Sequence, residues 1–120
     1  PPGGGYGWKK ICTTKGSTKF YNKTLAGIKS ALASLATGLA NKTHNVGVII
    51  GTNVLTKLAN KYFARKLNYA YMTQVSYYFY PTGKVIPTKV RLYTYGYAKS
   101  NYTDLVESTV SEHTIVIGGN

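Results

Sequence analysis

The stretch Leu25-Ala-Gly-Ile-Lys-Ser-Ala-Leu-Ala-Ser-Leu-Ala-Thr-Gly-Leu-Ala40 decides the expected fold. Its large apolar residues recur at steps of three and four, which places them on one stripe of an α-helix. Similar spacing runs from Val46 to Lys66, and the polar segment 41–45 between the two is typical of a turn. We therefore expect a pair of helices within about residues 24–66, with Asn22 or Thr24 as the N-cap of the first helix.

The hydrophobic period changes from 3.6 to 2 after Lys66, which indicates strands. Residues 67–80 predict a long strand, and Pro81-Thr-Gly83 after it is turn chemistry. Residues 84–98 predict the returning strand, which Pro87 should leave interrupted, bulged or on a sheet edge near its start, and residues 105–117 predict a third. Residues 8–11 are a candidate for one more short strand, before a loop at Gly16 and Ser17. One side of the long strand carries Tyr69, Tyr71, Val75, Tyr77 and Phe79.

These elements predict an α+β fold in which a two-helix hairpin packs on an antiparallel β-meander of three strands, or four with the short one. Residues 1–8 are rich in Gly and Pro and are expected to form a flexible arm. Residues 9–117 then make a single domain, with the helical pair at about 24–66 and the meander at about 67–117. Residues 118–120 are a tail.

Charge is the most unusual feature of the composition. Fifteen Lys and Arg residues stand against three acids, which gives a formal net charge of +12. All fifteen cations lie in residues 1–99, and all three acids lie in residues 100–120. Such an excess favours anionic partners: a membrane surface, a cell-wall polymer or a nucleic acid.

Little in the chain supports catalysis or a cofactor. Asp104 and Glu107, at positions i and i+3, fit a turn or helix start better than a catalytic pair. Cys12 with His44 or His113 has no flanking motif of a nucleophile and its base, and no metal-ligand spacing is present. We expect no enzyme activity, cofactor or metal site, and Cys12 is either an idle thiol, an intermolecular bridge or a reactive group.

A membrane-surface hypothesis uses much of the chain at once. Gly47 and Gly51 form a G-x-x-x-G in the second predicted helix, a spacing that permits close helix packing. Trp and Tyr side chains suit a headgroup interface, and cations attract anionic lipids. These features together resemble secreted cationic antibacterial proteins in character. The cations expected to bind the anionic surface are Lys9, Lys10, Lys57, Lys61, Arg65, Lys66, Lys89 and Arg91.

Aromatic and basic residues also interleave on the returning strand. Tyr93, Tyr95 and Tyr97 alternate onto one face with Lys89 and Arg91. With Trp8, the three tyrosines form a candidate aromatic platform of the kind on which single-stranded bases stack. The alternative is that these tyrosines serve only as good strand formers.

A third interpretation is structural. The cationic body of one subunit and the acidic end of the next suggest head-to-tail assembly, with the N-terminal arm adding a strand to an open sheet edge.

The leading hypothesis is a small exported cationic protein that acts at anionic surfaces, in the form of a bacteriocin-like antibacterial effector that perturbs membranes. Its partner would be an anionic membrane or cell-wall polymer, and the abundant Tyr, Thr, Ser, Gly and Asn agree with a secreted location. The alternatives are a self-assembling extracellular subunit and a Tyr/Arg nucleic-acid-binding module.

Overall fold

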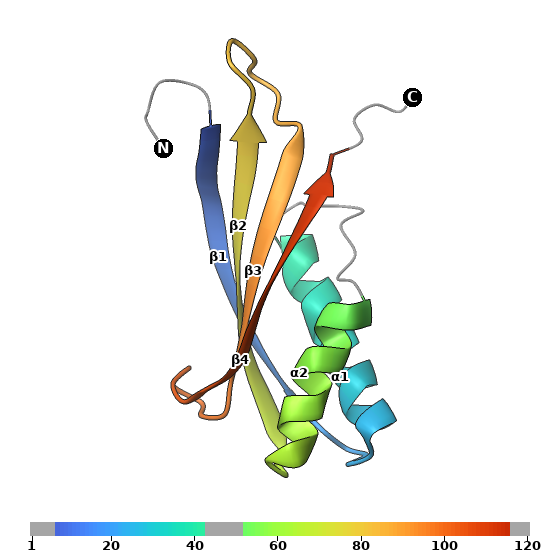
Figure 1. Cartoon of the computed structure of the whole chain (residues 1–120). Coiled ribbons are helices and arrows are strands. Elements are labelled where there is room, and N and C mark those ends of the chain that lie inside the picture. The colour runs from blue at the N-terminus through green and yellow to red at the C-terminus, as the bar shows by residue number, and fades with distance from the viewer. Residues whose placement is uncertain (1–6, 43–51, 116–120) are drawn as a thin grey trace.

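The computed structural model describes residues 7–42 and 52–115 of the 120-residue chain. Two helices lie together on one side of a layer of long strands (Figure 1). The predicted α+β fold is confirmed, with four strands in the sheet. The elements are β1 (Gly7–Lys19), α1 (Leu25–Lys42), α2 (Thr52–Ala64), β2 (Tyr69–Tyr80), β3 (Lys89–Tyr97) and β4 (Leu105–Thr114).

The sheet is antiparallel throughout, in the order β1-β2-β3-β4. The helical pair connects β1 to β2 along the chain. Helix α1 packs against these two strands, and α2 packs against β4 at the other edge of the sheet. At the end where β1 begins and β4 finishes, the strands extend past the helices (Figure 1). One face of the sheet is therefore partly covered by helices, while the other face carries no layer among the described residues.

Helix α1 begins where Thr24 caps it. The Gly27 backbone N–H donates to Thr24 Oγ1 at 3.0 Å, so Thr24 and not Asn22 is the N-cap. The apolar stripe then turns inward, although Leu25 at its edge is 39% exposed. The core combines this stripe with that of α2 and with the inner face of the sheet: Phe20, Ile28, Leu32, Ala36, Leu39, Leu55, Leu58, Ala59, Tyr62, Ala70, Met72, Val90 and Leu92.

Two strand glycines allow the helices to approach the sheet. A Cβ atom at Gly16 would lie 2.9 Å from a methyl group of Leu35 on α1. A Cβ atom at Gly96 would lie 2.8 Å from the hydroxyl oxygen of Tyr62 on α2. Larger side chains at these two positions would hold the helix layer away from the strands.

Several predicted boundaries differ from the structure. Strand β1 runs over thirteen residues, not four, and Gly16 and Ser17 belong to it instead of a loop. Gly7 and Trp8 also belong to β1, whereas residues 1–6 lie outside the described part of the chain. Helix α2 is described from Thr52, so the predicted start of that helix, with Gly47 and Gly51, lies outside the described residues as well.

The meander begins and ends close to its predicted bounds. In the β2–β3 loop the Lys84 N–H donates to the Pro81 carbonyl at 3.0 Å, and Gly83 supplies the positive φ of 75° that this turn requires. Pro87 precedes β3 instead of interrupting it. Strand β4 starts at Leu105, so the segment 104–107 does not form a helical turn.

Candidate functional site

Strand alternation leaves one face of the sheet open. In β3, Val90, Leu92 and Thr94 are buried under the helices, whereas Arg91 and Tyr93 are partly exposed on the opposite face. The pairing registers extend this division to the neighbouring strands. We call the face opposite the helices the open face. Its aromatic residues are Trp8, Tyr69, Tyr71, Tyr77, Phe79, Tyr93, Tyr95 and Tyr97. Its cations are Lys10, Lys15, Lys19, Lys89 and Arg91.

At one end of the open face, aromatic rings and cations from three strands stack together. The Trp8 ring lies 5.2 Å from that of Phe79, and the guanidinium carbon of Arg91 lies 4.0 Å from the centroid of the Trp8 ring. Lys89 Nζ lies 5.5 Å from the Phe79 centroid. Arg91 is held from its other side by Glu112 Oε1, which accepts from Nη2 at 2.7 Å and from Nε at 3.1 Å. These hydrogen bonds raise the pKa of Arg91 above its ordinary value, so the guanidinium stays charged.

Tyrosines continue the aromatic surface along the strands. The Tyr77 and Tyr93 rings meet edge to face at 5.5 Å in the middle of the face. Near the other end, the loop after β3 adds Tyr102, whose ring lies 5.9 Å from Tyr71 and 6.2 Å from Tyr97. Lys15 of β1 places its Nζ 5.1 Å from the Tyr102 centroid, so a cation accompanies the aromatic rings at this end too.

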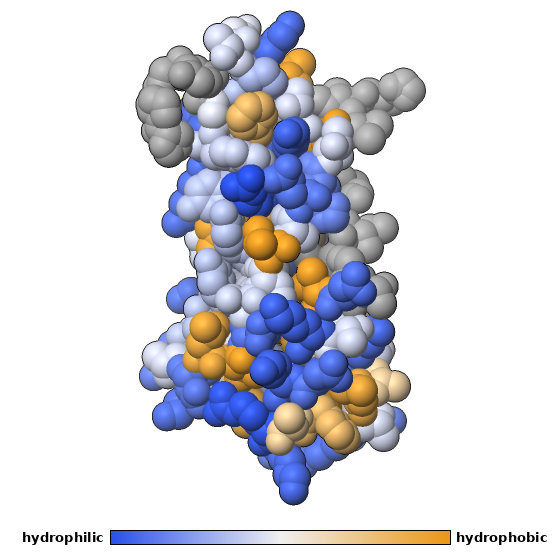
Figure 2. Space-filling view, in the orientation of Figure 1, coloured by the Kyte–Doolittle hydropathy of each residue, from blue (hydrophilic) through white to orange (hydrophobic). Residues whose placement is uncertain are grey.

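The aromatic residues on this face are partly exposed and lie among positive charges. Successive residues on one face of a strand stand about 7 Å apart, and neighbouring strands about 4.8 Å apart. The side of the molecule drawn in Figure 2, on which helices and strands are both in view, is mostly hydrophilic or intermediate, with apolar residues in separate patches. A surface of this kind can stack planar groups and attract the anions attached to them.

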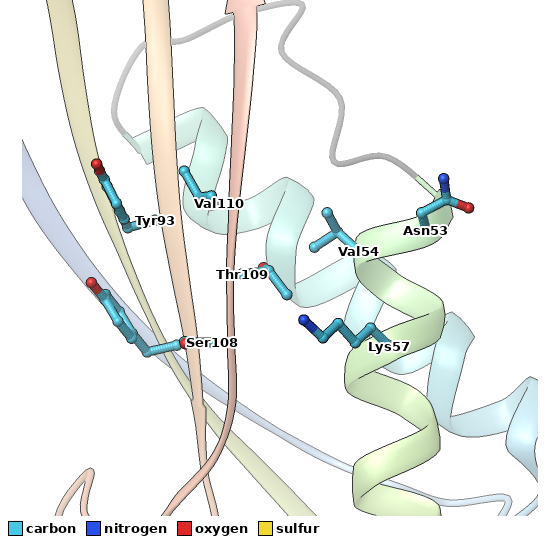
Figure 3. Close-up of a pocket in the computed structure, with 8 residues that line it drawn as sticks. Asn53, Val54, Lys57, Tyr93, Ser108, Thr109 and Val110 are labelled. Carbon is cyan, nitrogen blue, oxygen red and sulfur yellow. The ribbon is translucent and has the colours of Figure 1, made fainter.

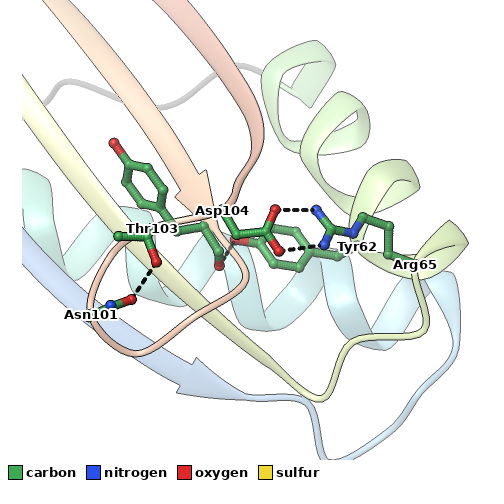
Figure 4. A network of polar contacts seen from close by, with 6 residues as sticks. Tyr62, Arg65, Asn101, Thr103 and Asp104 are labelled. Carbon is green, nitrogen blue, oxygen red and sulfur yellow. Dashed lines mark hydrogen bonds and ion pairs between the residues drawn. The ribbon is translucent and has the colours of Figure 1, made fainter.

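The three acids of the chain are all engaged in ion pairs with its own cations. Lys57 Nζ lies 3.1 Å from Glu107 Oε2, and Arg91 pairs with Glu112. Arg65 binds Asp104 with two hydrogen bonds, of 2.7 and 3.3 Å (Figure 4). Within the described residues, the other twelve of the fifteen cations form no ion pair with an acid.

The Arg65–Asp104 pair ties the end of α2 to the loop before β4. Asp104 has a φ of 63°, and its carbonyl accepts the N–H of Ala98 at 3.0 Å, so the loop closes around it. The Arg65 guanidinium hydrogen bonds hold the pKa of the Asp104 carboxyl below its ordinary value. Stability that comes from this pair is therefore present above the ordinary Asp pKa and is lost as the pH falls through the lower, folded-state value.

The predicted anionic-surface cations do not gather on one surface. Lys10, Lys89 and Arg91 lie on the open face, whereas Lys9 points to the helix side, 5.5 Å from the Tyr80 ring centroid. Lys57 and Lys61 belong to α2. Arg65 and Lys66 follow α2, and Lys57 and Arg65 are used in the ion pairs with β4 and its preceding loop.

All four residues of the predicted aromatic platform lie on the open face. Tyr71, Tyr77 and Phe79, which are predicted to share one side of their strand, lie on the same face as this platform. Lys15, Lys19 and Tyr102 also lie on or beside it and were not among the predicted residues. The alternation in residues 67–80 was the available signal for the first three. The other three depend on strand register and loop contacts, which no local pattern of residues indicates.

A groove of about 540 Å³ runs along the middle of the edge strand β4 (Figure 3). Ser108, Thr109 and Val110 form its floor. Val54 and Lys57 of α2 stand on one side of the strand, and tyrosines of β3 stand on the other (Figure 3).

Within residues 7–42 and 52–115, neither helix combines the length and the hydrophobicity that a membrane span needs. In the same residues, no three His, Cys, Asp or Glu side chains are grouped as metal ligands. No protein-family model, curated protein or solved structure matches this chain.

Proposed function

We propose that the protein binds single-stranded nucleic acid on the open face of its sheet. The observation that carries the proposal is a set of three groups of partly exposed rings along this face, with cations stacked on the first and the last. The groups are Trp8 with Phe79, Tyr77 with Tyr93, and Tyr71 and Tyr97 with Tyr102. Base–aromatic stacking is tolerant of sequence and needs unpaired bases, while the backbone phosphates need positive charge nearby. The open face offers both at once, and its one acid, Glu112, is neutralised by Arg91.

The buried helices favour this proposal over the leading sequence hypothesis, although the membrane effector stays a prediction. Helix insertion into a bilayer would require Leu32, Leu58 and Tyr62 to leave a core in which each is fully buried. Binding on the open face requires no such rearrangement. The same face also suits an anionic headgroup surface, so an experiment must distinguish the two partners.

The direct test is fluorescence anisotropy with a labelled single-stranded oligothymidine and a duplex of equal length. We expect binding to the single strand to be tighter, and to weaken steeply as salt rises from about 50 to 200 mM. Tyr77→Ala and Tyr93→Ala should each weaken binding by about fivefold or more, since stacking contributes about 1–3 kcal/mol per base. Lys89→Ala should lower the slope of log K against log salt by about 0.7.

Two matched variants on the helix layer serve as controls. Phe63→Ala removes a ring that is 47% exposed on α2, and Lys61→Ala removes an exposed cation from the same helix. Phe63→Ala should leave the affinity for the single strand unchanged. Lys61→Ala should lower that affinity only by the small, non-specific effect of removing one positive charge from the protein. Equal losses from the controls and the open-face variants, or no binding at about 50 mM salt, would refute the proposal. Dye leakage from anionic vesicles without oligonucleotide binding would instead support the membrane effector.

A further inference from the structure

The sheet has two open edges, β1 and β4. Strand β1 is thirteen residues long and β4 is ten, and each is hydrogen-bonded to one neighbouring strand in the described part of the chain. Long edges of this kind offer a row of backbone donors and acceptors to another strand. The groove beside Ser108, Thr109 and Val110 leaves space along the outer side of β4.

The two edge strands differ in charge, and both acids of β4 already pair with a cation from another element. Strand β1 contains Lys9, Lys10, Lys15 and Lys19 and no acid. Strand β4 contains Glu107 and Glu112 and no Lys or Arg. Lysines on an edge normally discourage pairing, because like charges would meet. Pairing β1 with β1 or β4 with β4 would bring like charges together, whereas β1 against β4 brings opposite charges together.

The geometry allows the same pairing. Because the strands alternate in direction, β1 and β4 run in opposite senses, and a second copy displaced along the sheet presents its β1 antiparallel to the first copy's β4. One cross-strand row on the open face reads Lys10, Tyr77, Arg91, Glu112. Continuing that row places Lys10 of the next copy beside Glu112. The second open-face row along from it, in the same register, places Lys15 of the next copy beside Ser108.

The helix layer is about as wide as the sheet. Four strands span about 19 Å across the sheet, and two packed helices span about 16–20 Å. Each copy therefore brings a helical pair about as wide as its own strands, so neighbouring pairs fit side by side.

We infer that a second copy of this chain docks on β4 through its β1 edge and extends the sheet from molecule to molecule. The contact is heterologous, so it leaves a free β1 at one end and a free β4 at the other and builds open filaments, not closed dimers. Strand twist of about 20–25° would turn each copy by roughly 80–100° from the last. The inference does not depend on the proposed function.

The test uses two edge variants and a mixture of them. Lys10→Glu with Lys15→Glu reverses the two β1 charges that face β4 in this register, and Ser108→Lys with Glu112→Lys makes the two β4 positions opposite them basic. Molar mass is measured by light scattering against protein concentration at about 0.15 M salt, where the Debye length of about 8 Å screens the repulsion between whole molecules. Filaments are sought by electron microscopy, and circular dichroism with urea unfolding checks that each variant is folded.

We expect the molar mass of the wild type to rise with protein concentration, well above the 13.1 kDa of one chain. The molar mass of each edge variant alone should stay near that of one chain. An equimolar mixture of the variants should assemble again, because every junction between unlike molecules is then complementary. Lys23→Glu with Lys61→Glu, which makes the same charge change away from both edges, should assemble like the wild type.

Each other outcome overturns the inference. A wild type that stays monomeric up to about 1 mM has no such interface. Assembly of the β1 variant alone would indicate β4–β4 pairing, and assembly of the β4 variant alone would indicate β1–β1 pairing. A mixture of two folded variants that fails to assemble would exclude the Lys10–Glu112 register.

Discussion

At the scale of single residues, Tyr62 connects helix α2 to the sheet. Its ring is fully buried, and its hydroxyl donates to the Tyr97 carbonyl at 2.8 Å. Burial raises the pKa of Tyr62 far above the ordinary tyrosine value. The unfolded chain releases this proton near pH 10 while the folded protein keeps it, so the contribution of Tyr62 to stability is complete below pH 10 and declines above it.

Tyr62→Phe should therefore lower the free energy of unfolding by about 1–2 kcal/mol at pH 7, because the Tyr97 carbonyl loses its donor. Between pH 7 and pH 11 the wild type alone should lose about 1.4 kcal/mol of unfolding free energy through Tyr62, so the difference between the two proteins narrows by that amount. Urea unfolding at pH 7 and pH 11 measures both values. Tyr21→Phe, at a side chain that is 89% exposed, should show no difference at either pH. A deficit of equal size at both pH values would contradict this account.

At the scale of elements, the same substitution should act in opposite directions at two glycines. Gly38 lies on the exposed side of α1, and a Cβ atom there would have no neighbour within 4 Å. Gly38→Ala should therefore raise the free energy of unfolding by about 0.5–1 kcal/mol through helix propensity. At Gly96 the added carbon would meet Tyr62 and Leu58, so Gly96→Ala should lower the free energy of unfolding by about 1–3 kcal/mol. Urea unfolding of both variants is the measurement, and a rise in the free energy of unfolding in both would show that α2 does not rest on Gly96.

The fold was largely predictable where hydrophobic periodicity is local. The stripe of α1 and the alternation of β2 follow from side-chain spacing alone. Strand β1 was predicted too short because Lys15-Gly-Ser-Thr-Lys19 is polar and contains a glycine, which is typical of a loop. Pairing with β2 and the approach of α1 at Gly16 make it a strand, and both are contacts between distant parts of the chain.

The candidate site, like the fold, was predictable only where it depends on the alternation of side chains along one strand. Alternation placed Tyr93, Tyr95 and Tyr97 on one face, as the structure has them. The stacking of Arg91 on Trp8 depends on how β1 and β3 both align with β2, which no local pattern encodes. The pairing of Lys57 with Glu107 depends likewise on the packing of α2 beside β4. Charge composition predicted an anionic partner, and the register determines which cations share a face.

At the scale of the whole molecule, the fold gathers the few acids and spreads the many cations. The acids lie in β4 and the loop before it, where each meets a cation from another element. The twelve remaining cations are distributed over both helices, the loops and the other strands. Their mutual repulsion opposes the compact state in the free protein, and a polyanion or a neighbouring acidic edge would relieve it.

Salt should therefore stabilise this protein, although exposed ion pairs alone would predict the reverse. Raising NaCl from about 0.01 M to 0.15 M shortens the Debye length from about 30 Å to about 8 Å, which screens repulsion among dispersed cations more than attraction within pairs in contact. We expect the urea midpoint to rise over this range at pH 7 and at fixed protein concentration. A variant with Lys23→Gln, Lys61→Gln and Lys89→Gln keeps all three ion pairs, so its midpoint should be higher at low salt and should rise less with added salt. A wild-type midpoint that falls with salt would mean that the pairs at Lys57, Arg65 and Arg91 outweigh the repulsion among all the other cations.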